Sequence, residues 1–148
     1  MVLALVSIAT SAGRVEARQG VREGRVEARV GEGMVAVLDS GQQLFMEAEP
    51  RRGEGLTNFT RRLCGTSEVS DIIAEVNGIN RKLLRGVSYK IPFDLLATDL
   101  QLASIKALFK DDRADSVGWR HSVQATSARG TESLWTIAQW FTGRGQNY

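Results

Sequence analysis

A cysteine and a histidine, which together can form a nucleophilic pair, each occur once in this chain and stand far apart in the sequence. Cys64, in "RRLCGT", is the one cysteine, and His121, in "WRHSV", is the one histidine. A catalytic cysteine needs a histidine and an orienting partner close to it in space, whereas a small buried cysteine needs neither. We predict that Cys64 is a buried residue rather than a nucleophile, and that His121 lies in a strand or loop.

Neither a metal centre nor an acid–base pair is indicated by the remaining polar residues. A zinc site usually takes several His, Cys or carboxylate ligands at recognisable spacing, and no carboxylate pair stands in a recognisable motif. One cysteine also leaves no disulfide within the chain. The sequence therefore predicts a chain without catalytic residues, metal or cofactor.

The charge pattern disfavours nucleic acid as a partner. The chain has 148 residues and a net charge of +2, and its acids and bases are interleaved, as in "RVEARQGVREGRVEAR". No basic block with interleaved aromatic residues is present, as a nucleic-acid surface would require. This length suits one ordinary domain or two very small ones.

The first residues predict export. An apolar run extends from Val2 to Ala9 and is too short to span a bilayer as a helix. Thr10 and Ala12 form an acceptable cleavage site. We interpret residues 1–12 as the remnant of a secretory signal peptide, which predicts a protein of the periplasm or cell wall. The alternative is a plain hydrophobic N-terminus, since no positively charged segment precedes the run.

Residues 13–43 predict a leader of short strands. The hexapeptide "GRVEAR" occurs at Gly13–Arg18 and again at Gly24–Arg29. Apolar and polar residues alternate within it, and a period of two places Val26, Ala28 and Val30 on one face of a strand. Asp39–Gly41 is a turn signal. The alternative is a disordered, charged leader over the first half of this segment.

Residues 44–93 change from a period of two to a helical period and back, which predicts a strand–helix–helix–strand unit. The first helix ends at Gly65, and the second at Asn77-Gly78, after a start capped by Thr66 or Ser67. The strand "VSYKIP" closes the unit. Two short helices would then pack on one side of an antiparallel strand pair. The predicted core contains Leu56, Phe59, Leu63, Ile72, Ile73, Val76 and Ile91.

The rest of the chain predicts a linking segment, 94–117, and a final segment, 118–148. In the linking segment, Thr98 or Asp99 caps a helix. The final segment contains a strand candidate, "WRHSVQA", and an amphipathic helix, "TESLWTIAQWF". The apolar faces of these two helices consist of Leu102, Ile105, Leu108 and Phe109 in the first, and Leu134, Ile137, Ala138 and Phe141 in the second.

"GTESLWTIAQWFTG" resembles the opening of a LysM domain, in which a short strand leads to Gly-Asp-Thr-Leu-Trp-x-Ile-Ala. Residues 118–148 would be the first half of such a repeat. "RRGEGLTNFTRRLCGTS", "IIAEVNGIN" and "LLRGVSYKIP" are similar to successive parts of a complete but divergent copy at 44–93. This copy has Glu54-Gly55 in place of the family's Asp-Thr, and Thr57 in place of its Trp. The expected fold class is α+β.

LysM modules bind N-acetylglucosamine glycans such as peptidoglycan, through the loop after the first strand and the loop after the second helix. By position, the resemblance implies contacts from Gly53, Glu54, Gly55, Leu56, Thr57, Asn77, Gly78, Ile79 and Asn80. Some of these positions also have a structural alternative, because Gly53 and Gly55 can shape a turn, Asn77-Gly78 can end a helix and Leu56 can belong to the core. We expect Trp135 in the core and Trp140 exposed.

Three hypotheses about function follow from the resemblance. The first is a glycan-binding module that anchors an exported bacterial protein to the cell wall. The second is a degenerate spacer or protein-docking unit that binds no glycan. The third concerns the parent protein: the arrangement resembles the N-terminal part of zinc-dependent N-acetylmuramoyl-L-alanine amidases, whose catalytic domain would lie beyond Tyr148.

Overall fold

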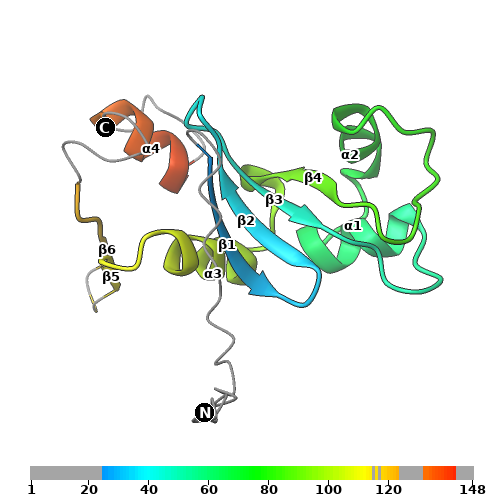
Figure 1. Ribbon diagram of the computed structural model, residues 1–148, viewed down its shortest axis with the longest axis horizontal. Helices are drawn as coiled ribbons and strands as arrows, with labels where there is room; N and C mark the ends of the chain where they lie inside the picture. Colours follow the sequence, from blue (N-terminus) through cyan, green and yellow to red (C-terminus); the bar gives the residue numbers. More distant parts are fainter. Residues whose placement is uncertain (1–24, 115, 117, 124–131, 143–148) are drawn as a thin grey trace, which may run out of the picture.

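The computed structural model describes residues 25–114, 116, 118–123 and 132–142, and an antiparallel sheet forms its centre (Figure 1). The strands are adjacent in chain order, β1-β2-β3-β4. They are Val26–Gly31, Met34–Leu38, Leu44–Ala48 and Tyr89–Pro92. Four α-helices accompany this sheet in the described part of the chain, so the predicted α+β class is confirmed.

The strands of the predicted leader belong to the same sheet as the strands that follow. Ala28 pairs with Ala36, Ala36 with Met46, and Met46 with Ile91. All four are buried and face one core, because alternate residues of a strand share a face. The alternation predicted for β1 is therefore confirmed. The first hexapeptide copy, the predicted signal peptide and the alternative of a disordered leader concern residues outside the described part.

Helices α1 (Leu56–Cys64) and α2 (Ser70–Val76) connect β3 to β4, which pair antiparallel. The predicted order of strand, helix, helix and strand is confirmed. Gly65 and Gly78 end the two helices as predicted, with φ angles of 75° and 60° that suit glycine. Helix α1 contacts α2, and α2 contacts β4. The buried residues that α1 contributes are Leu56, Phe59, Thr60 and Leu63.

The predicted apolar face of α2 is wrong at two positions. Ile72 is 45% exposed and Val76 is 43% exposed, whereas Ile73 is fully buried. Helix α2 is only 7 residues long, and its main contacts are with α1 and β4. One narrow stripe of the helix therefore reaches the core. That stripe passes through Ile73 and Ala74, which leaves Ile72 and Val76 facing outward.

Neither α2 nor α3 begins with the predicted side-chain cap. The residue that precedes α2 is Val69, and no side chain caps the helix there. The Thr66 hydroxyl instead accepts a hydrogen bond from the Glu68 backbone N–H, in the turn before the helix. Helix α3 likewise follows Ala97 without a side-chain cap.

After β4 the chain forms the short 3-10 helix η1 (Phe93–Leu95) and then α3 (Thr98–Leu108), which covers β1 and β2 (Figure 1). Strands β5 (Arg113–Ala114) and β6 (Trp119–Arg120) follow as a separate antiparallel pair. The predicted face of α3 is wrong at Leu102, which is 46% exposed on the side turned away from the sheet. The buried apolar residues of α3 are Ile105 and Leu108, and Phe109, which directly follows the helix, is also buried.

Helix α4 (Leu134–Thr142) packs at one end of the sheet, beside the turn that joins β2 to β3 (Figure 1). Trp140 is 1% exposed. Its indole Nε1 donates a 2.8 Å hydrogen bond to the backbone carbonyl of Gln42. Its ring lies 5.2 Å from that of Phe109, at the end of α3. One side chain of α4 therefore joins the turn to α3.

The predicted roles of the two indoles of α4 are both wrong. Trp135 is 53% exposed and Leu134 is 69% exposed, whereas Trp140 is buried. The side of α4 that meets the core contains Ile137, Trp140 and Phe141, three residues at i, i+3 and i+4. Leu134 stands at the start of the helix and Trp135 lies on the same side as the exposed Gln139, so both contact solvent.

Candidate functional site

The two loops predicted to bind glycan lie at the same end of the molecule, opposite α4 (Figure 1). Residues 53–57 lead into α1, and residues 77–80 follow α2. The nine residues predicted to contact glycan fall into two groups. The side chains of one group pack or form hydrogen bonds within the protein, and the residues of the other group are exposed.

Glu54 is committed to an ion pair. Its carboxylate accepts two hydrogen bonds of 2.8 Å from the Arg62 guanidinium and one of 2.8 Å from the backbone N–H of Arg51. The Arg62 guanidinium holds the pKa of the Glu54 carboxyl below its ordinary value, against the opposing effect of burial. Arg62 also donates to the Glu49 carbonyl and lies over the Phe59 ring. Glu54 therefore fixes the loop to α1 and the core.

We expect Glu54→Gln to lower the free energy of unfolding at neutral pH. The variant should also lose less stability than the parent chain when the pH is lowered. Because the folded state depresses this pKa, the contribution is complete above the ordinary value of 4.5 and is lost as pH falls through the folded value. A hydrogen bond to a charged group contributes roughly 1.5–3 kcal/mol. Urea unfolding at neutral pH and at acidic pH measures the difference between the variant and the parent chain.

Glu49→Gln is the matched control, because the Glu49 side chain is exposed and only its backbone carbonyl contacts Arg62. It should leave the unfolding midpoint close to that of the parent chain. Equal effects of the two substitutions at every pH would contradict a special role for Glu54.

Asn77 is also committed to the fold. Its Oδ1 accepts a 2.7 Å hydrogen bond from the Lys90 backbone N–H, and its Nδ2 donates to the Lys90 carbonyl at 2.7 Å. The same Nδ2 donates to the Ile73 carbonyl. The side-chain amide thus pairs with the outer edge of β4 as another strand would. Leu56 is buried, and Ile79 packs against the core.

The other five predicted positions are exposed. A Cβ built on Gly53, Gly55 or Gly78 would meet nothing within 4 Å. The open space leaves the backbone at these glycines accessible to an approaching ligand. The exposed members of the predicted site are Gly53, Gly55, Thr57, Gly78 and Asn80.

Cys64 and His121 do not form a catalytic pair. Cys64 is a half-buried free cysteine, and burial raises the pKa of its thiol to about 11. It therefore remains a thiol at neutral pH and is a poor nucleophile. The ring nitrogens of His121 face other groups, Asp112 and Glu132.

The surroundings of His121 were not foreseen from sequence. Its Nδ1 lies 2.8 Å from an Asp112 carboxylate oxygen, and its Nε2 lies 3.2 Å from one of Glu132. The three side chains are 8%, 1% and 0% exposed. Which ring nitrogen donates depends on the tautomer of the imidazole, and the two contacts join the ring to both carboxyl groups. We call these three residues the histidine cluster; it joins the end of α3, the residues after β6 and the start of α4.

The histidine cluster does not have the arrangement of a metal site. In the described part of the chain, no group of three or more His, Cys, Asp or Glu side chains has an arrangement that could hold a metal ion. The imidazole ring also packs against aromatic rings, with centroid distances of 5.0 Å to Phe109, 6.1 Å to Trp140 and 5.7 Å to Phe141. This packing is typical of a structural role.

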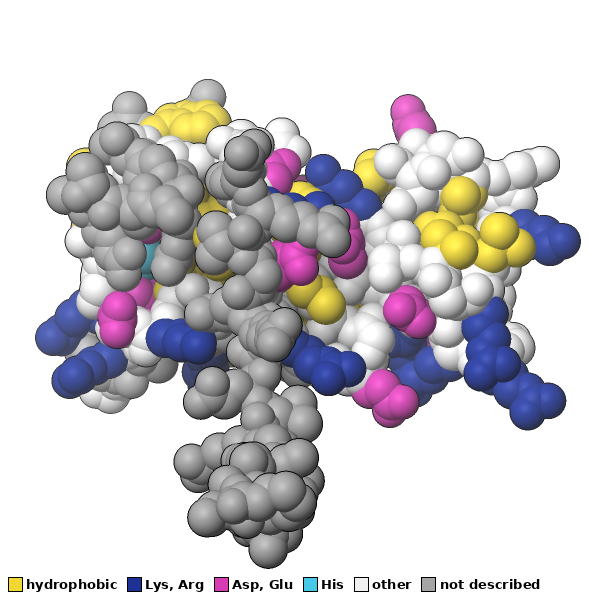
Figure 2. Space-filling model, in the orientation of Figure 1, with side chains coloured by type: hydrophobic (Ala, Val, Ile, Leu, Met, Phe, Trp, Pro, Cys, Tyr) yellow, Lys and Arg dark blue, Asp and Glu magenta, His cyan; other side chains and the backbone are white. Residues whose placement is uncertain are grey.

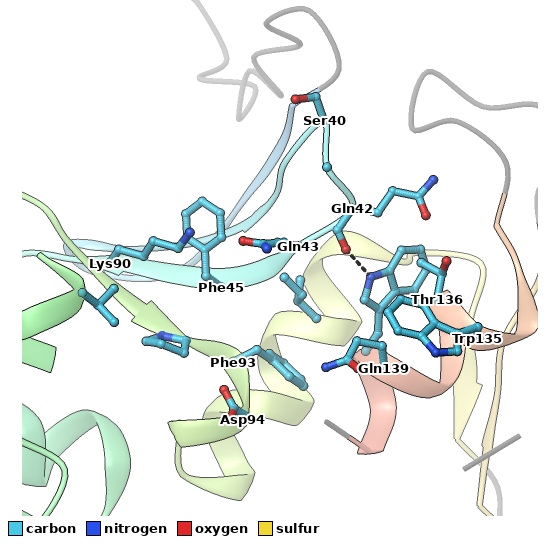
Figure 3. Close-up of a pocket in the computed structure, with 15 residues that line it drawn as sticks. Ser40, Gln42, Gln43, Phe45, Lys90, Phe93, Asp94, Trp135, Thr136 and Gln139 are labelled. Carbon is cyan, nitrogen blue, oxygen red and sulfur yellow. Dashed lines mark hydrogen bonds between the residues drawn. The ribbon is translucent and has the colours of Figure 1, made fainter. Parts of the chain in front are cut away.

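A groove of about 810 Å³ lies between the sheet and α4 (Figure 3). The turn after β2, strands β3 and β4, η1 and the first two turns of α4 line it, together with Val76 at the end of α2. None of the nine predicted contacts lines it. Sequence analysis missed it because the groove joins segments that are distant in the chain. The exposed indole of Trp135 forms part of its wall (Figure 3).

Charges of both signs are mixed over the face of the molecule shown in Figure 2, where Lys and Arg side chains lie among Asp and Glu. In the described residues, no helix has the length and apolar character needed to cross a membrane. Comparisons of the chain with family models, curated proteins and solved structures found no match in any of the three. The residues and their geometry are therefore the basis for a functional proposal.

Proposed function

We propose that this chain is a non-catalytic module that binds N-acetylglucosamine-containing glycans of peptidoglycan and anchors an exported bacterial protein to the cell wall. Gly53, Gly55 and Gly78 carry the proposal, because each presents backbone with open space around it. A polymeric sugar can then approach the main-chain N–H and C=O groups of both loops closely. Thr57 and Asn80 add exposed polar side chains beside them.

The LysM-like arrangement of residues 44–93 is part of this proposal. It is supported by the order β3, α1, α2 and β4, with the two strands paired antiparallel. Glu54, Leu56, Asn77 and Ile79 would then hold the loops in place rather than contact the sugar, since their side chains are engaged by the fold. Residues 118–148 would then correspond to the opening of a second LysM-like repeat.

A spacer or protein-docking unit is the second candidate function. The observation that favours it is the commitment of Glu54 and Asn77 to internal hydrogen bonds, which removes two polar side chains from the proposed glycan surface. A surface with few anchoring groups has little affinity left after the entropy cost of association. We therefore expect weak binding to peptidoglycan.

Gly55→Phe should weaken binding of the chain to purified sacculi. The φ of Gly55 is −85° and its ψ is 166°, an extended conformation that phenylalanine adopts readily. The new ring would occupy the open space and obstruct the sugar, so we expect a loss of about tenfold or more, or about 1.4 kcal/mol. Co-sedimentation over a range of sacculus concentrations measures the change.

Lys106→Phe is the matched control, since it adds the same ring at an exposed position of α3, away from both loops. It should bind as the parent chain does. Unchanged binding by Gly55→Phe, Thr57→Ala and Asn80→Ala alike would refute this site. A parent chain that fails to sediment with sacculi would favour the spacer.

A further inference from the structure

We propose that the groove between the sheet and α4 is a second carbohydrate site, which holds a sugar ring against the indole of Trp135. It is separate from the loops of the proposed function, although the ligand class rests on that proposal. Its volume of about 810 Å³ is within the range of roughly 300–1,000 Å³ that small-molecule sites usually have. Figure 3 shows its lining residues converging from the turn, β4, η1 and α4.

Trp135 provides a fixed apolar surface. It is 53% exposed and lies on a helix whose other indole, that of Trp140, is 1% exposed. Trp140 is held by its hydrogen bond to the Gln42 carbonyl and by ring contacts with Phe109. At the start of the helix, the Ser133 hydroxyl accepts a hydrogen bond from the Thr136 N–H. A platform that is already ordered loses little entropy when a ligand stacks on it.

Polar groups surround this platform in the manner that a sugar requires. The side chain of Gln43 and the carboxylate of Asp94 are exposed at the groove, and Gln139 lies on the same helix as Trp135 (Figure 3). On the side of the groove away from Trp135, the Lys90 ammonium lies 4.2 Å from the centroid of the Phe45 ring (Figure 3). Sugars present an apolar C–H face for the indole and hydroxyls for amides and carboxylates. An uncharged polyol suits a lining that holds one cation and one carboxylate.

An extended peptide fits this groove less well. Peptides commonly bind at a sheet by adding a strand to its edge through backbone hydrogen bonds. The edge here is β4, and both backbone polar groups of Lys90 already pair with the Asn77 side chain. Strand addition at this point would require displacing that amide, whereas a stacked sugar would not.

The groove extends from α4 toward the end of α2, in the direction of the proposed loop site. Val76, which lines the groove and is 43% exposed, directly precedes Asn77-Gly78. One glycan chain could therefore contact Gly78 at one end and Trp135 at the other. The two sites together would compensate for the few anchoring groups of the loops, because a tethered second contact acts at high effective concentration.

Trp135→Ala tests the inference in the full chain. The probes are soluble, β-linked N-acetylglucosamine oligomers and glucose oligomers of equal length, titrated by calorimetry and followed by indole fluorescence. We expect the parent chain to bind at least one of these with a change in fluorescence. In the variant, affinity should fall about tenfold or more, equivalent to about 1.4 kcal/mol. Gln43→Ala should weaken binding in the same direction.

Leu134→Ala is the matched control, since Leu134 is the 69% exposed neighbour of Trp135 and does not line the groove. It should bind the oligomers as the parent chain does. Equal oligomer affinity of Trp135→Ala and the parent chain would overturn the inference, as would binding of a peptide but of no sugar. Loss of oligomer binding in Trp135→Ala, with sacculus binding insensitive to Gly55→Phe, would support the groove while rejecting the loop site.

Discussion

Replacing Trp140 with alanine is expected to release α4 from the sheet. The side chain is 1% exposed, packs against Phe109 and donates its indole N–H to the Gln42 carbonyl. Truncating a buried tryptophan usually costs about 3–5 kcal/mol. Because a single helix of 9 residues is not stable in water, α4 should then lose its order. Amide hydrogen exchange over Leu134–Thr142 measures the loss directly.

Trp135→Ala is the matched control for this experiment, because it removes the same side chain from the same helix at an exposed position. It should change the free energy of unfolding by less than about 0.5 kcal/mol. Similar exchange rates in the two variants would show that α4 does not depend on the buried indole.

His121→Ala should also be strongly destabilising, because buried carboxyl groups lose a hydrogen-bond partner. It removes the ring between the carboxylates of Asp112 and Glu132, whose side chains are 1% and 0% exposed. Leaving a buried polar group without one of its hydrogen bonds typically costs about 1–3 kcal/mol, and two carboxyl groups each lose one here. We expect a lower urea midpoint and faster amide exchange in α4, since Glu132 lies just before it.

The companion variant replaces all three members of the histidine cluster, as His121→Ala with Asp112→Asn and Glu132→Gln. Neutral amides are less costly to bury than carboxylates that have lost a hydrogen bond, so this variant should recover part of the stability lost in His121→Ala. A triple variant that is less stable than the single variant would contradict the explanation by lost hydrogen bonds of the carboxyl groups. It would instead place the main cost in the aromatic packing of the ring against Phe109.

Local sequence signals predicted the elements of the fold well. Alternation placed Ala28 on the core face of β1, and Gly65 and Gly78 ended their helices with the positive φ angles that glycine allows. These features depend on neighbouring residues only, so a single sequence contains them. The same holds for the order of β3, α1, α2 and β4.

The rotation of the short helices was less predictable. Ile72 and Val76 are as apolar as Ile73, and Trp135 is as apolar as Trp140, so hydrophobicity alone did not decide which would be buried. The buried side of each helix is set by the elements it packs against, which are α1 and β4 for α2, and the turn at Gln42 for α4. The same distance hid the histidine cluster and the groove, because their members come together only after the helices have docked.

The contact between α4 and the sheet has a consequence for the order of assembly. The hydrogen bond from Trp140 to Gln42 joins residues that are 98 apart in the chain, whereas short turns connect β1, β2 and β3. Contacts between distant residues form late, since closing a long loop costs more entropy. We therefore expect the strands to form first and α4 to arrive last. Until it arrives, the ring of Phe109 lacks its cover, and this interval is when the folding chain is most prone to aggregate.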